Sequence, residues 1–201
     1  REHPAYERPV RRDCILAYAP CSPFECGLTP RPVSRRMRLL FPVSSTPWPM
    51  RLALESPNQP DVLQLIDALD AYQRPLYPPE SHHGIDLAAL LAPAVLFAVA
   101  RDDAGTAVGC GAVVLGPDYA ELKRMYVVPA ARGHNLGQQL LGWLEARAIA
   151  RGARRFVLET GYLQAAAIAL YTRCGYTLCA PFGSYVEDPN SVFMMKLVAS
   201  A

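Results

Sequence analysis

A short loop between an apolar strand and a helix holds the residue types that bind phosphate. In the stretch YVVPAARGHNLGQQLL, residues 126–141, a strand and a proline precede Arg132, Gly133 and Asn135. A helix N-terminus presents free N–H groups and a partial positive charge, and Gly133 lets the backbone approach an anion closely. Asn135 is a good N-cap residue and tolerates a positive φ. We therefore expect this loop to bind a phosphate, with Arg132 adding a fixed charge.

Two common nucleotide-binding loops do not fit this stretch. It lacks the Gly-Lys-Ser/Thr of the phosphate-binding NTPase loop, and its only glycines, Gly133 and Gly137, do not supply the G-x-G-x-x-G of dinucleotide-binding folds. On the local pattern alone, a capped helix without a ligand is the alternative, because strand, turn and capped helix recur in every α/β domain. A nucleotide-dependent enzyme on a doubly wound sheet is disfavoured by the hairpin expected at 94–116.

The loop is followed, in order, by two further motifs. The loop itself reads Arg132-Gly133-His134-Asn135-Leu136-Gly137. A later strand ends in Leu158-Glu159-Thr160, and the next helix reads Gln164-x-x-Ala167-x-x-Leu170-Tyr171-x-x-x-Gly175-Tyr176. The run from 120 to 176 resembles the GNAT superfamily of N-acetyltransferases, whose coenzyme A loop is R/Q-x-x-G-x-G/A and whose later helix is N/Q-x-x-A-x-x-L-Y-x-x-x-G-F/Y. Asn135 departs from the pattern, because the family usually has its middle glycine there.

The resemblance implies acetyl-CoA as co-substrate, with no metal. In the family the pantetheine arm bonds to the main chain of the strand that here ends at Val128, so we expect Met125, Tyr126 and Val127 to bind it. The pyrophosphate is then expected on the loop amides, which belong to Arg132, Gly133, His134, Asn135, Leu136, Gly137 and Gln138. Asn is the side chain best able to replace glycine in the left-handed conformation, so Asn135 weakens the loop match without breaking it.

Acetyl transfer to an amine requires a group that takes a proton from the alkyl ammonium, whose pKa is about 10. Glu121 aligns with the glutamate base of the histone-acetylating branch of the family. A period of two would place Glu121 on the same strand face as Met125 and Val127. The alternative is that Glu121 is a strand-end charge that pairs with Lys123 or Arg124.

The departing thiolate must gain a proton. Tyr171 matches the family tyrosine that protonates the coenzyme A sulfur, and a phenol with a pKa of about 10 keeps its proton at pH 7. The alternative is an ordinary core aromatic on a helix. A backbone N–H near Met125 could stabilise the oxyanion without any side chain.

The elements that must position these residues appear as hydrophobic periods from Met50 onward. The patterns predict helices from Asp61 to about Arg74, near 86–91, from Leu136 to Ile149 and at 164–174. They predict strands at 51–55, 94–101, 106–116, 119–128, 154–160 and 191–198. Strands first follow one another and then alternate with helices, so the expected fold class is α/β (α+β), a GNAT-like mixed, mostly antiparallel central sheet flanked by helices.

Composition separates the first 49 residues from this domain, which spans 50–199. Residues 1–49 hold eight Arg against four acidic residues, nine of the 19 Pro and no sustained period. We expect them to be a disordered extension, arising from upstream translation or from a leader. The net charge of +2 is too balanced for a main partner that is nucleic acid or an anionic membrane. The apolar stretch at 87–100 is interrupted by Pro93 and is too short to span a bilayer.

We therefore expect a cytoplasmic N-acetyltransferase that moves the acetyl group of acetyl-CoA directly to the amine of a small molecule. A protein lysine or N-terminus is the alternative acceptor, and a non-catalytic acyl-CoA binder is the alternative function. A homodimer is left open. His82 and His83 are expected to be solvated loop residues, because adjacent histidines rarely face one metal. An acceptor pocket, or else ordinary packing beneath loops, would use the aromatic residues Tyr72, Tyr77, Phe182 and Tyr185.

Overall fold

The computed structural model describes residues 50–199, so the expectation for residues 1–49 lies outside the described residues. The chain forms β1 (Met50–Leu54), α1 (Pro60–Gln73), the 3-10 turn η1 (Pro79–Ser81), α2 (Leu87–Leu90), β2 (Val95–Asp102), β3 (Ala107–Leu115), β4 (Ala120–Val127), η2 (Pro129–Ala131), α3 (Leu136–Ala150), β5 (Arg155–Gly161), α4 (Ala165–Arg173), β6 (Thr177–Leu178) and β7 (Ser191–Leu197). Each helix and strand expected from the sequence is present, and β6 is an addition. Among residues 50–199, no helix is both long and apolar enough to cross a membrane.

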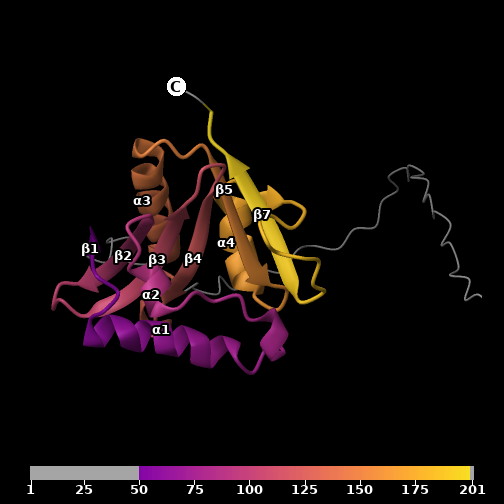
Figure 1. The fold of residues 1–201 in the computed structure, drawn as a ribbon. Coiled ribbons are helices and arrows are strands. Elements are labelled where there is room, and N and C mark those ends of the chain that lie inside the picture. The colour runs from indigo at the N-terminus through magenta and orange to yellow at the C-terminus, as the bar shows by residue number, and fades with distance from the viewer. Residues whose placement is uncertain (1–49, 200–201) are drawn as a thin grey trace, which may run out of the picture. The chain divides into compact units, whose positions relative to one another are not determined.

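The strands form one sheet in the order β1-β2-β3-β4-β5-β7-β6, with α3 and α4 on one face and α1 and α2 on the other (Figure 1). Only β4 and β5 pair in parallel. Alternation along β2 divides its side chains, because Leu96 packs beneath α3 while Phe97 packs beneath α1. The expected mixed, mostly antiparallel sheet is confirmed.

A β-bulge in β4 changes which side chains share a face. Cys110 pairs with Tyr126 and Ala112 pairs with Lys123, so two residues of β4, Arg124 and Met125, oppose one residue of β3. Arg124 adopts a φ of 55° at this bulge. As a result, both Leu122 and Met125 pack in the core beneath α3.

The expectation that Glu121, Met125 and Val127 share one strand face is therefore wrong. The extra residue reverses the alternation after Lys123, and Glu121 lies on the opposite face, where its carboxylate accepts a hydrogen bond from Tyr185. A period of two cannot be extended through a bulge.

The strands β4 and β5 separate soon after they begin to pair. Their parallel ladder runs only from Ala120–Phe156 to Leu122–Leu158. Beyond that point β5 continues to pair with β7 as far as Gly161, and β4 continues to pair with β3 as far as Val127. The sheet therefore opens in its middle, at Lys123 on one strand and Glu159 on the other.

A buried arginine fastens the start of α1 to the sheet. Arg101, at the end of β2, donates to the carboxylate of Glu55 through Nε and Nη2, at 3.0 and 2.8 Å, and to that of Asp61 through Nη1. It also donates to the main-chain oxygen of Gly105 at 2.9 Å. Since the far end of α1 carries Asp70 and Arg74, this network helps to place residues that line the cavity described below.

Replacing Arg101 by Met should lower the free energy of unfolding at pH 7 by about 2–3 kcal/mol, because the half-buried Glu55 loses its partner. The hydrogen bonds from Arg101 hold the pKa of Glu55 and of Asp61 below their usual values. Depressed carboxyl pKa values contribute stability above the unfolded pKa of about 4, and that contribution is lost as the pH falls through the folded values. Urea unfolding at several pH values should show that the difference in unfolding free energy between the wild type and the variant becomes smaller at acid pH.

The matched control is Arg51→Met, which removes an exposed arginine from the neighbouring β1. This change should alter the unfolding free energy by less than about 0.5 kcal/mol at any pH. An Arg101 variant as stable as the Arg51 variant at pH 7 would show that the network does not hold α1.

Candidate functional site

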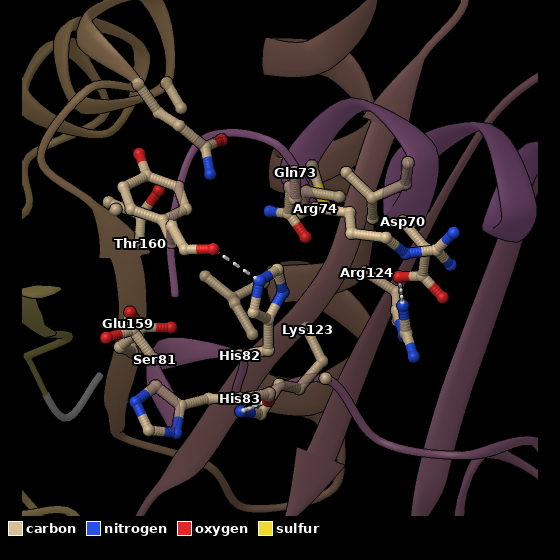
Figure 2. A pocket seen from close by; sticks show the side chains of 18 of the residues that line it. Asp70, Gln73, Arg74, Ser81, His82, His83, Lys123, Arg124, Glu159 and Thr160 are labelled. Carbon is tan, nitrogen blue, oxygen red and sulfur yellow. Dashed lines mark hydrogen bonds and ion pairs between the residues drawn. The ribbon is translucent and has the colours of Figure 1, made fainter. Parts of the chain in front are cut away.

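The opening between β4 and β5 leads into a cavity of about 340 Å³. Its walls come from the end of α1, the segment 74–84, β4, β5 and α4 (Figure 2). That volume lies at the lower end of the range for small-molecule sites. The cavity is therefore the candidate site, and the separation of the two strands is what creates it.

Glu159 is the first residue of β5 beyond the last pair with β4, and its carboxylate lines the cavity. It accepts a hydrogen bond of 2.7 Å from the Ser191 hydroxyl. Burial raises the pKa of Glu159 above its usual value, against the opposing effects of the Ser191 hydrogen bond and of the charges of His83 and Lys123. A half-buried carboxylate with a raised pKa can accept a proton from an amine.

Tyr171 lines the same cavity from α4 and is 7% exposed. Its ring packs edge-on against Tyr176 with the centroids 5.8 Å apart. Burial raises the pKa of Tyr171 further above the ordinary value of a phenol, so the hydroxyl keeps its proton at neutral and mildly alkaline pH. Within residues 50–199 no hydrogen bond engages that hydroxyl, so it can donate to a ligand.

Glu121 does not line this cavity, although it comes only one residue before Leu122, which does. Its carboxylate forms an ion pair of 2.9 Å with the Lys123 ammonium and accepts a hydrogen bond of 2.7 Å from Tyr185. Lys123 also donates to the main-chain oxygen of His83 at 2.9 Å. This geometry matches the alternative role considered for Glu121, a strand charge paired with Lys123. Its role as a base stays a prediction.

The predicted phosphate loop has the backbone that an anion site requires. Gly133 has a φ of 84°, and a Cβ added there would meet no heavy atom within 4 Å. Asn135 adopts the left-handed conformation, with φ 59° and ψ 15°, as expected for this substitute for glycine. It occupies the N-cap position, but its side chain makes no capping hydrogen bond, so that part of the expectation is wrong.

Several main-chain donors around this loop remain available to a ligand. In the part of the chain that the structure describes, the amides of residues 135–138 donate no hydrogen bond, and the helical ladder begins with Gln139 donating to the Asn135 oxygen. Arg132 donates from Nε to the Val127 oxygen at 2.9 Å, and its guanidinium lies 5.8 Å from the Tyr126 ring centroid. His134 and Gln138 are exposed, whereas the Leu136 side chain is buried in the core, so only its amide can meet a ligand.

The residues expected on β4 lie between this loop and the cavity. Met125 lines the cavity, and Tyr126 and Val127 follow it toward the loop. On the side that faces β5, the main chain of 123–127 has no ladder partner among the described residues. The edge is therefore free to accept an extended ligand.

Both histidines lie in the loop, as expected, with His82 exposed and His83 partly buried, and both also line the cavity. His82 forms a hydrogen bond of 3.0 Å through Nε2 with the main-chain oxygen of Tyr77. The ring of His83 packs edge-on against Tyr185 at 5.0 Å and lies 3.9 Å from the Asp188 carboxylate. The turn around η1 places them at the cavity wall, which the loop-like composition of 74–84 did not reveal. In residues 50–199 no set of three or more His, Cys, Asp or Glu side chains is arranged to hold a metal.

The aromatic residues expected at an acceptor pocket separate into two groups. Tyr77 lines the cavity, with its ring over Gly161 and its hydroxyl accepting from the Leu163 amide at 3.1 Å. Phe182 and Tyr185 belong to a separate packed cluster, and Tyr72 is exposed. Sequence reasoning missed Asp70, Arg74 and Glu159 as cavity residues. The only available signal was the position of Glu159 at the end of the strand that precedes the Gln164 motif.

Comparison with known proteins gives a consistent result. The model of the acetyltransferase (GNAT) family matches residues 62–176. The chain is 48% identical over 147 residues to a protein named IAA acetyltransferase from Azospirillum brasilense, a match that covers 72% of this chain and 95% of that protein. The structure of a putative acyl-CoA N-acyltransferase from Klebsiella pneumoniae is 40% identical, with a TM-score of 0.64 and coverage of 75% and 98%.

A more distant structure shares the fold alone. It is the PaiA N-acetyltransferase from Thermoplasma acidophilum, solved in complex with coenzyme A. It is 17% identical to this chain, with a TM-score of 0.56, and the match covers 74% of this chain and 99% of that one.

Gly161→Ala should remove Tyr77 from the cavity wall, because the added Cβ would overlap the Tyr77 ring. We expect a loss of about 1–3 kcal/mol in the free energy of unfolding, as for other overpacked sites. In a Tyr77→Ala background the same change should cost less than about 0.5 kcal/mol, because the clash is gone. Chemical denaturation of the four proteins measures this coupling.

Gly142→Ala is the matched control, since a Cβ at that position in α3 would meet no heavy atom within 4 Å. It should stabilise the protein by about 0.5–1 kcal/mol, as expected for alanine in a helix. Additive effects at Gly161 and Tyr77 would contradict the packing described above.

Proposed function

Because the chain belongs to the GNAT family of acetyltransferases, we propose that it transfers the acetyl group of acetyl-CoA directly to the primary amine of a small molecule. The observation that carries this proposal is the cavity at the separation of β4 and β5, which brings a carboxylate, Glu159, and a protonated phenol, Tyr171, to one small volume. A general acid and a general base are the two proton-transfer groups that the reaction needs.

We propose that the coenzyme lies along the free edge of β4 and ends at the start of α3. The main chain of Met125, Tyr126 and Val127 would bind the pantetheine arm. The pyrophosphate would be held by Arg132 and by the amides of the loop, from Gly133 and His134 through Asn135, Leu136 and Gly137 to Gln138. Two features fit this group: the unengaged amides of 135–138 and the open space at Gly133. The same fold holds coenzyme A in the Thermoplasma protein.

In the proposed reaction, bound acetyl-CoA supplies a thioester carbon for the amine to attack. Glu159 accepts the proton that the ammonium must lose, and the amine nitrogen then forms a bond to the carbonyl carbon. The main-chain N–H near Met125 stabilises the negative charge that develops on the carbonyl oxygen. As the carbon–sulfur bond breaks, the Tyr171 hydroxyl gives its proton to the sulfur, and the second proton that leaves the nitrogen restores the Tyr171 hydroxyl. The products are an N-acetylated amine and the free thiol.

We assign the base to Glu159 rather than to Glu121 because of where the two carboxylates lie. Glu159 lines the cavity and has no ion pair with a cation among the described residues, whereas Glu121 is bound to Lys123 and Tyr185. Glu121 remains the second candidate, acting through its partners or through water. A cytoplasmic location and a homodimer also stay predictions.

Glu159→Gln should lower kcat by about 100-fold or more in a thiol-release assay with acetyl-CoA and a panel of amines, because the variant lacks a base. In the wild type, activity should rise with pH as Glu159 loses its proton, at a pKa raised above its usual value by burial. That acidic limb should disappear in the variant. Tyr171→Phe should lower kcat while leaving the KM for acetyl-CoA within about twofold.

Glu121→Gln is the matched comparison for the base. If Glu159 is the base, this variant keeps the acidic limb and loses less than about tenfold in kcat. The opposite ranking of the two variants would return the assignment to Glu121. A protein that binds coenzyme A but releases no thiol with any amine or peptide would be a binder rather than an enzyme.

Gly133→Ala should weaken coenzyme A binding, measured by calorimetry, because the new methyl group lies where the pyrophosphate is proposed to approach. Gly105→Ala is its matched control, since Gly105 has nearly the same φ of 82° and the same open space but lies in the β2–β3 turn. Both changes should cost about 1–2 kcal/mol of stability. Equal coenzyme affinity in the two variants would place the phosphate elsewhere.

A further inference from the structure

Among the described residues, three Lys or Arg side chains line the cavity, and two of them are already neutralised by carboxylates. Lys123 forms an ion pair with Glu121. Arg124 forms an ion pair with Asp70 and donates to the main-chain oxygen of Ile85. The charges of Lys123 and Arg124 are therefore not available to a ligand.

Arg74 is the remaining cation of the three. It follows the last residue of α1, lines the cavity and is exposed. Within residues 50–199, its guanidinium makes no hydrogen bond or ion pair. An arginine at a helix C-terminus also interacts favourably with the helix dipole, which is the ordinary explanation for its position. That explanation does not require the side chain to face a cavity.

The opposite wall carries the complementary charge. Glu159 accepts a hydrogen bond from Ser191, but no cation of the described ranges lies within ion-pair distance of it. In Figure 2 Glu159 lies on one side of the view, and Arg74 lies on the other beside Asp70 and Arg124, with His82 between them. One end of the cavity therefore favours an ammonium and the other favours an anion.

We propose that the acceptor carries a carboxylate as well as the amine that reacts, and that Arg74 binds this carboxylate. The inference rests on the proposed acetyl transfer and adds the substrate class to it. Guanidinium groups bind carboxylates through two parallel hydrogen bonds, which gives both energy and orientation. The amine end must be the end at Glu159, because the acid and base for the reaction lie there. A cavity of about 340 Å³ is large enough for a small amino acid or a similar molecule.

The test compares ω-amino acids of three to six carbons with their carboxamides, which have the same shape and lack the charge. Thiol release is measured with the full chain at saturating acetyl-CoA. The wild type should prefer the acid over the amide by about tenfold or more in kcat/KM, chiefly through KM. The chain length with the largest preference reports the span between Glu159 and Arg74.

Arg74→Gln should reduce the ratio of acid to amide in kcat/KM to about one. Arg74→Lys should recover part of the ratio, because lysine keeps the positive charge but cannot make the two parallel hydrogen bonds of a guanidinium. Arg173→Gln is the matched control, since Arg173 is also an exposed arginine at the end of a helix but does not line the cavity. The control should keep the wild-type ratio. If the Arg74 substitutions affected only the stability of the protein, the ratio of acid to amide in kcat/KM would stay at the wild-type value in all three variants.

The outcomes separate this inference from the proposed function. Acetylation of acids and amides with equal kcat/KM, or a ratio that Arg74→Gln does not alter, would overturn the inference and leave the transferase activity intact. If no amine is acetylated, the acids are titrated calorimetrically into the protein saturated with coenzyme A. Heat that Arg74→Gln abolishes would support the carboxylate site even though the proposed reaction fails, and the absence of heat would overturn both.

Discussion

The constraint on which the site depends is the loss of hydrogen bonding between β4 and β5 after three pairs of residues. Two neighbouring strands that separate leave main-chain donors and acceptors without partners, and such groups are costly when they are removed from water. A ligand that lies along the β4 edge and bonds to it would restore those interactions. The opening in the sheet is therefore both the source of the cavity and a physical reason for an extended ligand to bind there.

The bulge at Arg124 determines which side chains reach that opening. A non-glycine residue in the left-handed region is strained by about 1–2 kcal/mol, and here the Arg124 side chain offsets the strain through Asp70 and the Ile85 oxygen. The same bonds tie β4 to α1 and to the segment before α2. Since the bulge also turns Met125 into the core, Lys123 and Arg124 are left as the polar residues of β4 that face the cavity.

The sequence predicts most of the fold, because each helix and strand has a clear apolar period and nearly every boundary lies within a residue or two of the structure. It also predicts the loop, since Gly133 and Asn135 are there for their backbone and both adopt a positive φ. It does not predict the bulge, because no residue of AELKRMYV is typical of a left-handed turn. That one position is why Glu121 was placed on the wrong face. His82, His83 and Arg74 emerge as cavity residues only in three dimensions for a different reason, since the loop-like composition of 74–84 does not reveal how that segment folds.

The groups proposed for proton transfer and the groups proposed for acceptor binding line the cavity from different elements. The groups proposed for proton transfer come from β5 and α4, whereas Arg74, Asp70 and the histidines come from α1 and the segment after it. If these residues bind the acceptor as proposed, a change in α1 or in that segment would alter which acceptor binds, while Glu159 and Tyr171 stay on their own elements. Arg101 limits this freedom at the other end of α1, because it fixes the first turn to β1 and β2. The residue proposed to select the acceptor thus lies at the end of a helix whose first turn is fixed to the sheet.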